Sequence, residues 1–149
     1  MVLGLVYLAL GTALAAGPAP VGPKHAPTLE EYISELEADR RSDRLYAVRE
    51  LRRQVRQAVR ESQRRSGSLR QAEALQSLAL YDELLAPKCL LAVPEHEELR
   101  PSCADILRYL QTESALQPLQ QALELEQRGW ALRKIERAME AIEDAKGPA

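Results

Sequence analysis

Apolar residues recur at intervals of three and four along most of the chain, and this spacing predicts helices rather than strands. The pattern starts after Thr28, which stands three residues before Glu31 as in a capping box, so the first helix is expected over about 28–38. Further helices are expected over about 42–65, 69–85, 99–110, 117–127 and 129–145. The predicted fold class is therefore all-α.

Residues that start or stop helices set these boundaries. Ser42 is expected to cap the second helix, and the sequence Ser-Gly-Ser at 66–68 is expected to end it. Pro87 is expected to interrupt the third helix, which leaves the segment KCLLAV before Pro94 as a very short helix. Pro101 is compatible with a helix only in its first turn.

The start of the chain has the pattern of a targeting segment. An apolar run ends in the small-residue sequence Ala13-Leu14-Ala15, which predicts a secretory signal peptide over 1–16 that is cleaved, although no Lys or Arg precedes the run. A buried N-terminal helix and an uncleaved anchor are the alternatives. Residues 17–27 contain four prolines and predict an extended leader. The folded domain is thus expected over 28–146 of an exported chain, periplasmic or extracellular, with no membrane span after cleavage.

Export changes the interpretation of Cys89 and Cys103, because oxidising compartments allow two thiols to form a disulfide. If the chain reverses near Pro94, two antiparallel helices bring the sulfurs together. The alternative is two small buried side chains that never form a bond. Two cysteines with scattered histidines lack the spacing of a metal site, so no metal is expected.

A short pattern of Arg, a small residue and two aliphatic positions occurs several times. It appears as RLYAVREL at 44–51, RPSCADIL at 100–107 and RGWALRKI at 128–135, which places Ala47, Cys103 and Ala131 in one column. QAEALQSL at 71–78 fits as a further copy with Ala74 in that column and Gln in place of Arg. The copies then begin 27, 29 and 28 residues apart. A fixed period of this kind is typical of helical repeat proteins.

This pattern resembles HEAT-like repeats, particularly the short class first noted in phycobilisome lyases, and the last segment ALQPLQQALELEQRGWALRKIERAMEAI matches it best. The resemblance implies a short α-solenoid of antiparallel helix pairs, in which the repeated Arg pairs with acids in neighbouring turns, here Asp43, Glu98 and Glu126. The missing turn within 42–65 and the short KCLLAV segment depart from the pattern. An irregular helical bundle is therefore the alternative.

Charge is segregated although the formal net charge is only -2. Residues 40–70 contain eleven arginines and three acids, whereas the chain from 71 onward carries eight basic and fourteen acidic residues. Helical spacing places six of the arginines on adjacent faces of one helix: Arg49, Arg52, Arg53, Arg56, Arg60 and Arg64. Such a stripe is a candidate surface for an acidic protein or an anionic envelope component, whereas nucleic acid is not expected for an exported chain. The alternative is a solvated face that keeps the helix soluble.

Signatures of catalysis are missing from the sequence, which has no nucleophile motif, phosphate-binding glycine loop or HExxH pattern. The acids at 95–98 are expected to favour a helix N-terminus, and Trp130 is expected to be a packing anchor. The predicted function is a protein-interaction or scaffold module that is no enzyme and has no cofactor. The alternatives are an accessory or lyase-like factor of an enzyme system and a self-associating structural bundle.

Overall fold

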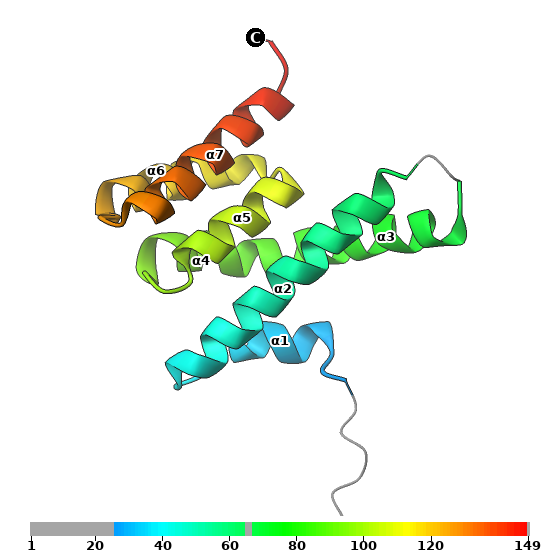
Figure 1. Cartoon of the computed structure of the whole chain (residues 1–149), viewed down its shortest axis with the longest axis horizontal. Coiled ribbons are helices and arrows are strands. Elements are labelled where there is room, and N and C mark those ends of the chain that lie inside the picture. Colours follow the sequence, from blue (N-terminus) through cyan, green and yellow to red (C-terminus); the bar gives the residue numbers. More distant parts are fainter. Residues whose placement is uncertain (1–25, 65–66, 149) are drawn as a thin grey trace, which may run out of the picture.

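The structure is a computed structural model that describes residues 26–64 and 67–148, in which every regular element is a helix (Figure 1). The predicted signal peptide and nearly all of the predicted leader lie outside the described residues. The elements in chain order are α1 (Leu29–Glu35), α2 (Arg41–Ser62), α3 (Leu69–Leu80), the π-helical turn η1 (Tyr81–Leu85), α4 (Ala86–Glu95), α5 (Arg100–Leu110), the 3-10 turn η2 (Glu113–Ala115), α6 (Leu116–Leu125) and α7 (Gly129–Ala145). The all-α prediction is confirmed.

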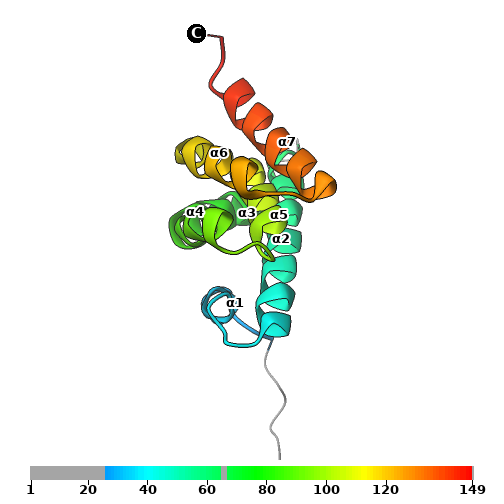
Figure 2. The same cartoon turned by 90° about the vertical axis from the view of Figure 1, so that its left-hand side faces the viewer.

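The helices form two layers. Helices α2, α5 and α7 lie side by side in one layer, and α1, α4 and α6 form the other (Figure 2). Each helix of the first layer packs on one of the second: α2 on α1, α5 on α4, and α7 on α6. Helix α3 packs along the second half of α2 and leads through η1 into α4 (Figure 1).

Leucine, isoleucine, valine and alanine fill the space between the layers. Leu51, Leu107 and Ile135 are fully buried, one each from α2, α5 and α7. The small residues Ala47, Cys103 and Ala131 are fully buried in the same three helices, as expected where helix backbones approach closely. Ala74 is also buried, but it lies in α3, which packs on α2 and does not belong to the layer of α5 and α7. QAEALQSL is therefore not equivalent to the other three segments.

Capping side chains mark the starts of two helices, α1 and α3. Thr28 caps α1 in a complete capping box with Glu31, as expected. Ser68, which is predicted only to help end the preceding helix, caps α3 by accepting from the Gln71 amide. The prediction that Ser42 caps α2 is wrong, because α2 starts at Arg41 and Ser42 lies within its first turn. The guanidinium group of Arg44 donates to the carbonyls of Ala38 and Asp39, at 2.7 and 3.0 Å, and so fixes the preceding turn.

The prediction that Pro87 interrupts the third helix is also wrong. Helix α3 continues through η1 into α4, where Pro87 lies in the first turn. Proline has no amide hydrogen and its ring collides with the carbonyl four residues earlier. In η1 the Ala86 amide donates to Tyr81, five residues back, so the helix widens just before Pro87. The KCLLAV segment thus belongs to a ten-residue helix that includes Pro94.

Arginines at the starts of α2, α5 and α7 bond to carboxylates in the loops. Arg44 Nη2 donates to Glu98 Oε1 at 2.7 Å, so the expected pairing with Glu98 is confirmed. Arg100 Nη1 and Arg128 Nε donate to Glu126 at 3.0 and 2.8 Å, so one buried carboxylate holds two guanidinium groups. These bonds join the start of one helix in the layer to the loop before the next.

Cys89 and Cys103 are buried free thiols in α4 and α5. Their side chains lie close enough for a hydrogen bond, which together with burial raises the pKa of the Cys89 thiol well above its usual value. The expected proximity is therefore present, but no disulfide is formed, and both side chains pack as small core residues. The disulfide stays a prediction for the exported chain.

We expect both thiols to resist alkylation in the folded chain. Burial and the raised pKa of Cys89 keep the thiol protonated, and only the thiolate reacts with iodoacetamide. Mass spectrometry after labelling at about pH 8 should therefore show little modification without urea and two adducts in urea. Rapid labelling in buffer contradicts this arrangement, and an unlabelled chain in urea indicates that the disulfide has formed.

Glu126 is expected to make stability depend on pH. Hydrogen bonds from Arg128, and to a lesser extent Arg100, lower the pKa of this carboxyl to about 2. A carboxyl with a lower pKa in the folded chain stabilises it above about pH 5 and loses that effect as the pH falls toward 2, here worth about 3 kcal/mol. Urea unfolding of the wild type and Glu126→Gln should show a large difference at pH 7 that shrinks with acidification. A difference that does not change with pH would exclude this role.

Candidate anion-binding groove

The arginine stripe of α2 divides into two parts. Its core-facing side carries Val48, Leu51 and Val55, so the arginines lie on the opposite side, where the sequence predicted them. Four of them line a groove with α5 and α7: Arg49, Arg52, Arg53 and Arg56. Arg60 and Arg64 do not line it, because Arg60 lies in the last turn of α2 and Arg64 follows the helix and pairs with Glu61 at 3.2 Å. Only four of the six predicted arginines therefore line the groove.

Helices α5 and α7 complete the groove, which has a volume of about 510 Å³. They add three cations, Arg108, Lys134 and Arg137, together with Asp105 and Tyr109. The sequence does not indicate these residues as a group, because Arg108 lies in α5 and Lys134 and Arg137 lie in α7, far along the chain from α2. Their spacing does carry a signal, because Lys134 and Arg137 stand next to the buried Ile135 and Ala138 in the same way as the α2 arginines stand next to the core residues of α2.

Asp105 organises the floor of the groove. It is 7% exposed, and its carboxylate contacts cations from all three helices of the layer. Arg52 of α2 lies at 3.3 Å and Arg108 of α5 at 3.7 Å, while Lys134 of α7 is the tightest partner. One negative charge faces three positive ones, so the floor keeps an excess of positive charge and holds these side chains in place.

The rim of the groove carries cations without a counter-charge. Arg49, Arg56 and Arg137 make no ion pair within the described part of the chain. Arg53 is paired with Glu50, whose pKa is lowered by the hydrogen bond from Arg53. The lining therefore has seven cations and two carboxylates. Guanidinium groups bind carboxylate, phosphate and sulfate oxygens through paired hydrogen bonds, so this groove suits an anionic ligand.

Other candidate features have structural partners. In the 95–98 segment, Glu98 pairs with Arg44, and Glu97 lies 3.4 Å from Arg128. These two acids therefore form ion pairs with arginines in addition to lying just before the N-terminus of α5. Trp130 is half-exposed and lies 5.2 Å below the guanidinium group of Arg128, so it is not a core anchor. The described residues contain no cluster of three or more potential metal ligands. Among the described helices, none is both long and apolar enough to cross a bilayer.

Comparisons with known proteins find no counterpart: no protein-family model matches the chain, and neither a curated protein nor a solved structure is significantly similar to it. The groove must therefore be interpreted from its own chemistry.

We expect Asp105→Asn to destabilise the fold by about 1–3 kcal/mol in urea unfolding, because three cations would lose the charge between them. Sulfate should recover part of this loss, since the anion can bind in the groove beside the same three cations. Asp144→Asn removes an exposed carboxylate of α7 and serves as the matched control for the general stabilising effect of sulfate. Equal sulfate responses in the two variants and the wild type would show that Asp105 matters only for packing.

Proposed function

We propose that the chain is a non-catalytic interaction module that holds an acidic segment of another protein in the groove of α2, α5 and α7. The observation that supports this most is the convergence of seven cations from three helices on one groove. A solvated arginine face needs no such convergence, because surface arginines of a single helix are soluble without partners from elsewhere in the fold. Three of the cations are fixed by Asp105, which reduces the entropy lost when a ligand binds.

A short solenoid with HEAT-like helix pairs is the proposed architecture. It is supported by the order of the contacts, with α1 on α2, α4 on α5 and α6 on α7, and by buried small residues at Ala47, Cys103 and Ala131. The arginine bonds at Glu98 and Glu126 also recur from one pair to the next. Binding surfaces of solenoids are commonly formed by one layer of helices, which is where the groove lies.

The recessed shape favours a protein segment over a membrane surface. Lys134 and Arg108 at the floor are only 28% exposed, so a flat array of lipid headgroups would reach the rim and leave them without contacts. A flexible acidic segment can enter and meet both levels. Partner recognition outside the cytoplasm, after removal of the predicted signal peptide, is part of the same proposal.

Charge reversal at the rim tests this function. The triple variant Arg49→Glu, Arg56→Glu and Arg137→Glu should weaken binding of a glutamate-rich peptide by about a hundredfold, measured by fluorescence anisotropy at low salt. None of the three side chains makes an ion pair in the described structure, so the fold should be retained, and circular dichroism checks this.

The matched control is Arg41→Glu, Arg60→Glu and Arg133→Glu, three exposed arginines outside the groove with the same change in net charge. It should weaken binding by less than about fivefold, the part that comes from long-range attraction. Equal losses in the two triple variants would contradict the groove. Tighter binding of dextran sulfate than of the peptide would assign the site to an envelope polymer, and a concentration-dependent mass without peptide would indicate self-association.

A further inference from the structure

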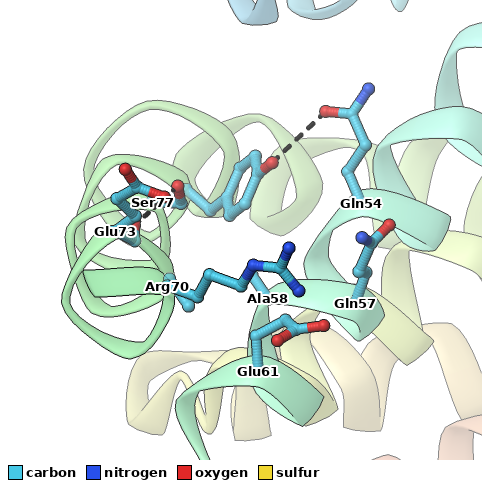
Figure 3. Close-up of a pocket in the computed structure, with 9 residues that line it drawn as sticks. Gln54, Gln57, Ala58, Glu61, Arg70, Glu73 and Ser77 are labelled. Carbon is cyan, nitrogen blue, oxygen red and sulfur yellow. Dashed lines mark hydrogen bonds between the residues drawn. The ribbon is translucent and has the colours of Figure 1, made fainter. Parts of the chain in front are cut away.

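A second cleft, lined by polar side chains, lies between α2 and α3 (Figure 3). It has a volume of about 450 Å³ and does not include any residue of the basic groove. Helix α2 contributes Gln54, Gln57 and Glu61, and α3 contributes Arg70, Glu73 and Ser77. Its remaining lining residues are Ala58, Ala74 and Tyr81.

This composition is unusual for the facing sides of two packed helices. Helix pairs are ordinarily stabilised by apolar side chains between them, which are removed from water together. Here α3 buries only one of its residues, Ala74, and contact with α2 is made through small or partly buried side chains. The polar lining therefore contributes little apolar burial to holding α3 in place.

Some hydrogen-bonding groups of the cleft are already paired and others are not. Tyr81 donates its hydroxyl to Gln54 Oε1 at 3.2 Å, and Ser77 donates to the Glu73 carbonyl at 3.0 Å (Figure 3). Glu61 Oε2 is buried without a hydrogen bond in the described structure. Arg64 lies 3.2 Å from that oxygen, but the contact is an ion pair without hydrogen-bond alignment.

Arg70 and Glu61 face each other without forming an ion pair. The guanidinium group of Arg70 extends from α3 toward α2 and points toward Gln57 and Glu61 (Figure 3). No ion pair between Arg70 and Glu61 is found among the described residues. The guanidinium group of Arg70 and the carboxylate of Glu61 therefore lie beyond ion-pair distance. A group that fills this gap must accept from Arg70 and donate to Glu61. A peptide group has one acceptor and one donor and meets both requirements.

We propose that the cleft of α2 and α3 binds an extended polypeptide segment of a partner through its main-chain amides. The carboxamide of Gln57 offers the same combination of donor and acceptor to a neighbouring peptide group. An anion would satisfy Arg70 but would be repelled by Glu61 and Glu73, whereas a cation would be repelled by Arg70. Main-chain recognition uses both signs of charge and tolerates different side chains. This inference does not depend on the basic groove, since none of its residues is shared.

The test uses the full chain labelled with nitrogen-15 and a short uncharged peptide of alternating serine and alanine, acetylated and amidated at its ends. Addition of the peptide should produce saturable shifts in the amide resonances of the cleft residues of α2 and α3. An analogue with methylated main-chain nitrogens should bind at least about tenfold more weakly, because it cannot donate to Glu61. An uncharged probe keeps the basic groove out of the measurement.

Substitutions in α2 and α3 test which side chains of the cleft bind the peptide. Arg70→Met and Glu61→Ala should each weaken the peptide by about tenfold, whereas Glu61→Gln, which keeps an acceptor oxygen, should stay within about threefold of the wild type. Gln76→Ala changes an exposed residue of α3 outside the cleft and should have no effect. Equal binding of the methylated analogue, or the absence of saturable shifts at these residues, would overturn the proposal and leave water as the occupant of the gap.

Discussion

Hydrogen-bonded ion pairs between helix starts and the following loops fix how α2, α5 and α7 lie in one layer. Arg44 bonds to Glu98 before α5, and Arg100 bonds to Glu126 before α7. Arg100 and Glu126 are almost fully buried, so removing Glu126 would leave the charge of Arg100 inside the protein without compensation. The groove depends on these bonds, because its cations come from all three helices and converge only while the helices remain aligned.

Helix α2 is the element that connects the different surfaces. One side packs into the core through Ala47, Leu51 and Val55, the opposite side supplies four arginines to the basic groove, and the end near Glu61 borders the polar cleft. A helix of 22 residues is long enough to serve both surfaces, since it extends beyond α5 to meet α3 (Figure 1). An acidic segment in the groove and an extended segment in the cleft would therefore be held on the same rigid element.

The sequence predicts most helix positions because apolar spacing and capping residues are local signals, as at Thr28. It fails at Pro87, where the preceding π turn removes the conflict that proline creates in a regular α-helix. The arginine stripe was visible from α2 alone. Asp105 was not, because its role arises only when three distant helices meet around it. The copy at Ala74 matched by composition, although only the packing shows that α3 lies elsewhere.

The π turn at Tyr81–Leu85 also sets the rotation of α3 about its own axis. A π turn contains one residue more than the α-helical turn it replaces, and one residue corresponds to about 100° of rotation in an α-helix. Shortening this segment by one residue would bring α3 and α4 into a single regular helix and turn the side chains of α3 by about a quarter of a revolution. Arg70, Glu73 and Ser77 would then no longer face α2. The π turn thus divides one long helix into two parts that are rotated differently: the polar side chains of α3 face α2, and the apolar side chains of α4 face the core.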